Sequence, residues 1–325
     1  MERIAFITAD RVISWNSAVM VLAISVAGCF FLAIYLYRAK NVVAAFAAAP
    51  LALVLSVVLA RAVHWYCNHE RYESFLRAVT DYSTGGYALV GAFAGCLLAA
   101  LLLRLARVSG NLPEMADCMC LAGAAGIAVG RLASLFNASD RGQMVETIRS
   151  MPWVYPVTNI TSGAVEYRLA TFLIQAMVAG GLFLILTVFY LTGKKRSLKD
   201  GDTALIFLLL YGASQIVLDS TRYDSMYFRS NGFVSVVQVM SLVAMAAAIG
   251  VFSVRMVKAR GLRKWYPALW AGILALIGCA GYMEYHVQRH GNEALFAYSV
   301  MSACLLLAAV LTLVIRHEAE RLPAD

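Results

Sequence analysis

The sequence has few charged residues, and this shortage excludes most classes of protein. Only 14% of its 325 residues are Asp, Glu, Lys or Arg, whereas 61% are hydrophobic. Soluble domains carry about 25% charged residues. The mean hydropathy of +0.72 is therefore too high for a water-soluble domain. The sequence also lacks a convincing internal repeat and any low-complexity segment.

The sequence contains no compact metal-binding motif. Its seven cysteines are scattered and mostly lie inside apolar blocks, where they are expected to act as small hydrophobic side chains. Cys118 and Cys120 form a lone Cys-x-Cys pair with no histidine nearby in sequence. We therefore expect no metal and no cofactor.

The formal net charge of +8 does not indicate a nucleic-acid partner. The basic residues form short clusters between apolar blocks, which is typical of loops that anchor a membrane protein on the cytoplasmic side. The lipid bilayer is the expected surroundings of the chain, and no nucleic acid is expected.

The apolar residues form blocks of about 20 residues, the length of helix that crosses a hydrocarbon core about 30 Å thick. Only helices and closed barrels satisfy their backbone groups in lipid, and uninterrupted apolar runs indicate helices. The predicted fold class is an all-α, polytopic integral membrane protein with about nine transmembrane helices. The predicted spans are approximately 17–37, 42–66, 85–103, 115–136, 169–192, 202–221, 233–254, 265–283 and 294–315.

The distribution of Lys and Arg predicts the orientation. Dense basic clusters at 38–40, 104–107, 194–199, 255–264 and 316–321 all fall on one side of the predicted membrane. That side is expected to be cytoplasmic. The N-terminus and the long 137–168 connection would then lie outside the cytoplasm, and the C-terminus inside.

A few ionisable residues fall inside the predicted spans. Of 27 Lys and Arg residues, only Arg61 and Arg131 do so, and Asp219 falls near the end of a third span. An arginine at a helix centre costs on the order of 3 kcal/mol on insertion scales. All three residues are expected at the same depth, near the outer leaflet.

Each of these residues belongs to a polar stripe with helical spacing. Guanidinium groups pair bidentately with phosphate, so arginines at this depth suit a lipid headgroup. The alternative is that each arginine simply snorkels to the headgroup region. The stripes are Arg61 with His64, Arg131 with Ser134 and Asn137, and Gln215 with Asp219 and Arg222.

From Gly130 and Arg131 onward the sequence resembles the prolipoprotein diacylglyceryl transferases. The family signature reads approximately Gly-Arg-Ile-Gly-Asn-Phe-Ile-Asn-Gly-Glu, and residues 130–140 occupy that stretch. Arg131 and Asn137 match the signature, whereas its first asparagine falls on Ser134 and its acid is displaced to Asp140.

The resemblance covers roughly residues 15–255. Other motifs agree in order and spacing: Ala60-Arg61, the glycine-rich segment from Gly85 to Gly91, Pro152-Trp153 with Pro156, Tyr211-Gly212 with Asp219 and Arg222, and Gln238 with Ser241. The chain also departs from the family pattern. A family histidine falls on Val90, a family arginine on Gln215, and a family glutamate on the shorter Asp219.

Two spans follow the seven that are usual for the family. We predict a transferase-like core at 1–255 and an additional C-terminal transmembrane pair at 256–325, which is not an independent domain. No charged residue lies within the predicted spans of this pair.

The resemblance implies transfer of a diacylglyceryl group from phosphatidylglycerol to the lipobox cysteine of a preprolipoprotein signal peptide. Arg131 is expected to be catalytic and to hold the phosphate with Arg61 and, more loosely, Arg222. Asp219 would hold an arginine in place. The base stays open between His64 and Asp140, and the third alternative is that a strongly cationic site lowers the thiol pKa enough without a base. The expected substrate-binding residues are Arg61, Ser134, Asn137, Tyr211, Gln215, Asp219 and Arg222.

Two alternatives come from other classes of function. A catalytically degenerate relative would bind lipid or lipoprotein without turnover, and the valine at position 90 is the feature that favours it. A transporter predicts ionisable residues near the bilayer midplane, whereas here they fall near helix ends.

Overall fold

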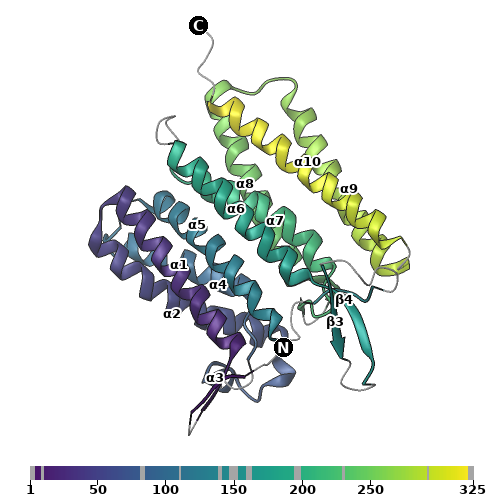
Figure 1. Cartoon of the computed structure of the whole chain (residues 1–325). Helices are drawn as coiled ribbons and strands as arrows, with labels where there is room; N and C mark the ends of the chain where they lie inside the picture. The colour runs from purple at the N-terminus through teal and green to yellow at the C-terminus, as the bar shows by residue number, and fades with distance from the viewer. Residues whose placement is uncertain are drawn as a thin grey trace. The chain divides into compact units, whose positions relative to one another are not determined.

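The computed structural model describes residues 4–8, 11–80, 85–109, 111–137, 141–145, 153–158, 163–193, 199–228, 231–290 and 293–320. It is dominated by long helices (Figure 1). These are α1 (Trp15–Ala39), α2 (Val42–Cys67), α4 (Leu89–Leu105), α5 (Leu112–Arg131), α6 (Thr171–Gly193), α7 (Asp202–Ser220), α8 (Val236–Arg260), α9 (Tyr266–His290) and α10 (Ala294–Glu320).

Every predicted span coincides with one of these helices. Within the part of the chain that the structure describes, eight helices are long and apolar enough to cross a membrane, and α4 is a shorter apolar helix. Large apolar side chains such as Leu184 and Ile185 on α6 are more than 60% exposed, as expected for a surface that faces lipid rather than water. The prediction of an all-α, multi-pass membrane protein is confirmed.

Polar residues set several of the helix ends. The side-chain oxygens of Ser14, Asn41 and Asn111 accept hydrogen bonds from backbone N–H groups in the first turns of α1, α2 and α5. Such caps satisfy donors that a helix leaves unpaired at its N-terminus. At α7 the cap comes from a distant helix, because the buried Asp117 of α5 accepts from the backbone N–H groups of Gly201, at 2.8 Å, and Ala204, at 2.7 Å.

The helices form two compact units. Unit 1 comprises Met1–Ala204 with Thr221–Gly232, and unit 2 comprises Leu205–Ser220 with Phe233–Asp325. Within unit 1, α1 packs against α5, α5 against α6, and α2 against α4; within unit 2, α10 packs against α8 and α9. The division into a core at 1–255 and an additional pair at 256–325 stays a prediction.

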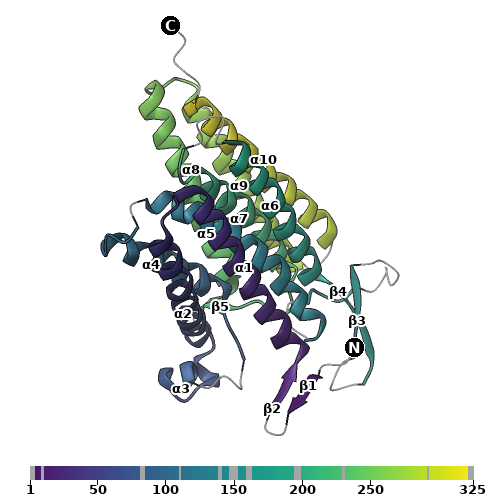
Figure 2. The ribbon, with the colours of Figure 1, turned by 60° about the vertical axis from the view of Figure 1, so that its left-hand side comes forward.

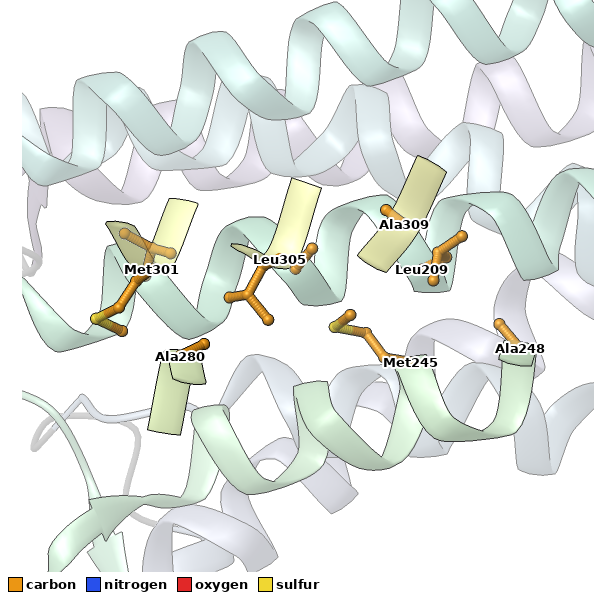
Figure 3. Packing of buried hydrophobic residues seen from close by; sticks show 9 residues of the cluster. Leu209, Met245, Ala248, Ala280, Met301, Leu305 and Ala309 are labelled. Atoms are coloured by element: carbon orange, nitrogen blue, oxygen red, sulfur yellow. The ribbon is translucent and has the colours of Figure 1, made fainter. Parts of the chain in front are cut away.

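Unit 2 has a core to which the C-terminal pair contributes directly. Leu209 of α7, Met245 of α8, and Met301 and Leu305 of α10 are almost completely buried in one apolar cluster. Figure 3 shows these side chains converging, together with Ala280 of α9. The two C-terminal helices are therefore integral to the packing of α7 and α8.

Short elements gather at one end of unit 1, which we call the hairpin end. There α1 begins, α2 ends and α6 begins (Figures 1 and 2). The elements are β1 (Ile4–Thr8) paired with β2 (Arg11–Ser14), the short helices η1 (His69–Arg71) and α3 (Phe75–Thr80), and β3 (Val154–Thr158) paired with β4 (Val165–Leu169).

The hairpin of β3 and β4 lies within the 137–168 connection, for which the sequence predicted no secondary structure. Val154 pairs with Leu169 and Thr158 with Val165. A further short hairpin, β5 (Tyr227–Phe228) with β6 (Asn231–Ser235), precedes α8.

Glycines allow α2 and α4 to approach very closely. A Cβ atom added at Gly91 would lie 2.3 Å from the carbonyl oxygen of Leu59, and one at Gly95 would lie 2.4 Å from the backbone nitrogen of Ser56. The Ser56 hydroxyl also donates to the Ala92 carbonyl oxygen at 2.9 Å. Small residues spaced four apart are typical of such close membrane-helix contacts.

This contact predicts that Gly95→Ala destabilises the protein by about 1–3 kcal/mol, because the added methyl group meets backbone atoms that cannot move independently. Thermal unfolding in detergent measures the effect. Gly28→Ala is the matched control, since a Cβ atom at this position of α1 meets nothing within 4 Å. Equal melting temperatures for the two variants would contradict the close packing of α2 on α4.

Candidate functional site

Arg61 lies in the last two turns of α2 and is only 2% exposed. Its Nε donates to the carbonyl oxygen of Ala78, and its Nη1 donates to that of Gly86 at 2.7 Å. The guanidinium carbon lies 5.0 Å from the ring centre of Tyr72 and 5.3 Å from that of Tyr87. The Arg61 side chain thus contacts three parts of the connection between α2 and α4. These are the chain directly after η1, the short helix α3, and the segment before α4.

His64 lies one turn further along α2 and joins the same cluster, as the spacing predicted. Its Nδ1 lies 3.1 Å from the Tyr72 hydroxyl. Its ring packs on Gly86, where an added Cβ atom would lie 2.5 Å from Nε2. Gly86 has a φ of +85°, so both its backbone conformation and its contact with the imidazole require glycine.

This cluster also includes the segment on which the resemblance places a family histidine. Gly85 to Ala88 form no regular secondary structure, and the Ala88 N–H donates to the Ala60 carbonyl oxygen at 3.0 Å. Val90 is half-buried in the first turn of α4. A histidine from α2 therefore packs against the glycine-rich segment that carries valine at position 90.

Arg131 is the last residue of α5, and the 3₁₀ helix η2 (Leu132–Leu135) follows directly. A 3₁₀ helix has three residues per turn, so Ser134 follows Arg131 on one side, whereas Asn137 lies two residues beyond η2. Arg131 is half-buried, Ser134 is buried and Asn137 is exposed. Phe136 stacks on Trp15 at 6.0 Å, which ties this segment to the start of α1.

Asp140, the second candidate base, lies outside the described residues. The described chain resumes at Arg141, whose Nη2 donates to the Asn137 carbonyl oxygen at 2.8 Å. The role of Asp140 as a base stays a prediction.

Residues 141–145 form backbone bridges to two other segments at the hairpin end. Gly142 pairs with Arg222, and Met144 pairs with Arg168 of β4. An added Cβ atom at Gly142 would lie 2.6 Å from the Cβ of Leu169 and 2.6 Å from the Thr171 hydroxyl oxygen. The segment is therefore held tightly between β4 and the chain that follows α7.

These bridges bring the backbone of Arg141 and Arg168, which the sequence did not single out, beside that of Arg222, which it did. Arg168 forms an ion pair with Glu166 at 2.7 Å and lies 4.3 Å from the ring centre of Tyr223. Arg141 lies 4.8 Å from the ring centre of Tyr155. Arg222, a predicted site residue, pairs with Asp224 at 3.0 Å.

Three predicted site residues, Tyr211, Gln215 and Asp219, belong to α7 within unit 2. All three are buried. The Tyr211 ring stacks on Phe207 at 5.1 Å. The Asp219 carboxylate accepts a hydrogen bond from the Ser235 hydroxyl at the start of α8. The expectation that Asp219 holds an arginine, and the assignment of all three to a headgroup, stay predictions.

Among the described residues, no group of three or more His, Cys, Asp or Glu side chains is placed to hold a metal ion. The described titratable and cationic groups at the hairpin end include arginines, tyrosines, the histidines His64 and His69, and carboxylates such as Glu166. Such a set can bind an anion and move a proton.

The contacts of Arg61 predict that Arg61→Lys behaves like Arg61→Ala, because a lysine ammonium lacks the planar fork that meets two carbonyl oxygens between two tyrosine rings. Hydrogen exchange of the Ala88 amide should rise at least tenfold in both variants. Arg77→Ala is the control, since the Arg77 side chain is 63% exposed and pairs with the exposed Glu73 of the same segment. If the Ala88 amide of the Arg61→Lys variant exchanges as slowly as in the wild type, the two hydrogen bonds of the guanidinium are not required.

Residues 3–254 match the family model described as prolipoprotein diacylglyceryl transferase. That match includes every predicted site residue, whereas the C-terminal residues from 255 onward lie outside it.

Several relatives carry the name phosphatidylglycerol–prolipoprotein diacylglyceryl transferase. The protein of Finegoldia magna is 26% identical over 253 residues, which are 77% of this chain and 94% of the relative. The protein of Clostridioides difficile is 23% identical over 201 residues, 62% of this chain and 74% of the relative. The protein of Bacillus licheniformis is 23% identical over 221 residues, 66% of this chain and 77% of the relative. With a family match over more than three quarters of its length, the chain belongs to the prolipoprotein diacylglyceryl transferase family.

Proposed function

We propose that this chain transfers a diacylglyceryl group from phosphatidylglycerol to the cysteine of a prolipoprotein in the bacterial cytoplasmic membrane. Family membership supports the reaction class, and the names of the relatives supply the two substrates. The observation that carries the proposal in this chain is the set of arginines at the hairpin end. Arg61, Arg131, Arg141, Arg168 and Arg222 come from five different segments of unit 1.

Three of these arginines are shielded from water. Arg61 is 2% exposed, and the side chains of Arg168 and Arg222 are 14% and 10% exposed. Positive charge held at low exposure attracts an anion more strongly than charge in bulk water. The phosphate of a lipid headgroup is the anion that a membrane supplies at this depth.

The arginines divide into two roles. Arg61 donates to two backbone carbonyl oxygens, and Arg168 and Arg222 pair with acidic neighbours. These three shape the site, and the charges of Arg168 and Arg222 are offset by their carboxylate partners. Arg131, half-buried at the end of α5, is the arginine that we assign to direct contact with the phosphate. Ser134 on η2 and Asn137 just beyond it would donate further hydrogen bonds to the headgroup.

The reaction requires one bond to form and one to break. The cysteine sulfur attacks the glyceryl carbon that carries the phosphate, forming a sulfur–carbon bond. The carbon–oxygen bond to the phosphate breaks, and its electron pair leaves on glycerol phosphate. Arg131 stabilises the charge that develops on the departing phosphate oxygen, which is the effect of a preorganised cation. The thiol proton must pass to a base, because the thiolate is the nucleophile.

We assign the base to His64. The imidazole lies against Gly86, and its Nδ1 is within hydrogen-bond distance of the Tyr72 hydroxyl. When Nδ1 carries the hydrogen and donates it to Tyr72, Nε2 is left as an acceptor for the thiol proton. The histidine is thus supplied by α2 rather than by position 90.

The hairpin end is assigned to the outer side of the membrane, with the N-terminus outside and the C-terminus in the cytoplasm. Within unit 1, Arg38 and Arg104 lie in the last turns of α1 and α4, at the opposite end, in agreement with the positive-inside rule. This orientation gives the site access to signal peptides that have crossed the membrane.

Complementation tests the assignment. In bacteria depleted of their own transferase, the wild-type chain should restore lipidation of a reporter prolipoprotein. Arg131→Ala should lower lipidation at least 100-fold, because no other group replaces the contact with phosphate. The control is Arg77→Ala, which removes an exposed arginine from the same end of the molecule.

Two results would count against this assignment. Failure of the well-expressed wild type to lipidate the reporter contradicts the transferase function and favours the reading of a relative that binds without turnover. Full rescue by Arg131→Ala contradicts only the assigned contact between Arg131 and the phosphate, and does not contradict the transferase function.

His64→Ala should lower kcat about 100-fold in a purified transfer assay, because general base catalysis contributes factors of this order. Tyr72→Phe should lower it less, about tenfold, since the imidazole stays in place but loses the partner that fixes its tautomer. His69→Ala, an exposed histidine in η1, serves as the control. A normal kcat for His64→Ala would remove His64 from the mechanism.

A further inference from the structure

A buried carboxylate lies on the C-terminal pair, where the sequence indicated none. The predicted span ended at residue 283, but α9 continues to His290. Glu284 therefore lies inside the helix and is only 7% exposed. The expectation that this pair carries no embedded charge is wrong, because the helix is about two turns longer than its apolar block.

Glu284 is bonded through one of its two oxygens. Its Oε1 accepts hydrogen bonds from Gln238 Nε2 at 2.9 Å and from Gln288 Nε2 at 2.6 Å. Its Oε2 is buried and has no hydrogen-bond partner among the described residues. An acidic group removed from water is costly unless its contacts are satisfied, so this residue is not an ordinary lipid-facing side chain.

Gln238 connects Glu284 of α9 to the start of α8 through hydrogen bonds. Its Oε1 accepts from the Ser235 N–H at 3.0 Å, while the Ser235 hydroxyl oxygen accepts from the Gln238 N–H at 3.0 Å. This reciprocal arrangement is a capping box. The Nε2 of Gln238 also lies 3.3 Å from the Ile216 carbonyl oxygen on α7.

The network ends at a candidate site residue. The Ser235 hydroxyl donates to the carboxylate of Asp219, which is 1% exposed. One continuous chain of hydrogen bonds within unit 2 therefore runs from Glu284 through Gln238 and Ser235 to Asp219. In such a chain each bond polarises the next, and removal of one end weakens the others.

We propose that Glu284 is a positioning residue, through which the additional C-terminal pair fixes Gln238, the cap of α8 and Asp219. The effect on the reaction rests on the proposed transferase function, whereas the effect on geometry does not. Asp219 stands where the family pattern has a longer glutamate, and Gln215 stands where it has an arginine. A shorter acid without that arginine needs another restraint, and α9 supplies it.

Three variants test the proposal in the full-length protein in detergent. Glu284→Ala removes the acceptor of Gln238, whereas Glu284→Gln keeps an oxygen that can accept the same hydrogen bond. Glu293→Gln makes the corresponding chemical change at an exposed position in the same hairpin of helices. The readouts are the exchange rates of the Ser235 and Gln238 amides, and kcat and KM for phosphatidylglycerol and a lipobox peptide.

The proposal predicts that Glu284→Ala raises exchange of the two amides at least tenfold and lowers kcat at least tenfold, with KM changed less than twofold. Glu284→Gln should stay within threefold of wild type in every readout, and Glu293→Gln should match wild type. Gln238→Ala should give the same kcat as the double variant Gln238→Ala/Glu284→Ala, because both residues act through one chain of contacts.

Unchanged amide exchange or unchanged kcat in Glu284→Ala overturns the proposal, as does an equal loss of melting temperature and activity in the alanine and glutamine variants. The last result would mean that the residue only supports folding. If the wild type shows no transfer, the proposed function fails, and amide exchange alone then decides the positioning role.

Discussion

The hydrocarbon core of a membrane offers no water to a polar group, and this constraint determines how every buried charge in the chain is arranged. Arg61 meets it by donating to two backbone carbonyl oxygens between two tyrosine rings. Asp117 meets it by capping the start of α7. In each case the charged group joins two parts of the chain that are distant in sequence. Polar residues in this protein are therefore the connections between apolar helices.

The same constraint separates residues that build the site from those that are available to a substrate. Backbone carbonyl oxygens hold the Arg61 guanidinium in a fixed position. Arg61 therefore fixes the connection between α2 and α4. Arg131 stands at the end of α5, where a 3₁₀ turn carries Ser134 onto the same side. The tight fit of His64 on Gly86 adds a titratable group to that framework. In the proposed site, Arg61 sets the shape, Arg131 supplies positive charge and His64 transfers a proton.

The sequence predicted the helices well because lipid imposes a length and a composition on each span. It also predicted that Arg61 and His64 share a face, since helical spacing is local. It did not predict the bridges of residues 141–145, which place Arg141 and Arg168 beside Arg222, because pairing of short strands depends on contacts between distant segments. Glu284 was missed for a different reason. Glu284 lies one residue beyond the apolar block that ends at residue 283, whereas α9 continues to His290.

The most direct test of the account is an experimental structure of the chain in a lipid bilayer that contains phosphatidylglycerol. The account predicts the lipid phosphate within hydrogen-bond distance of the Arg131 guanidinium at the hairpin end of unit 1, with Arg61 still bound to the carbonyl oxygens of Ala78 and Gly86. A phosphate bound elsewhere, with Arg131 directed into bulk lipid or water, would contradict it.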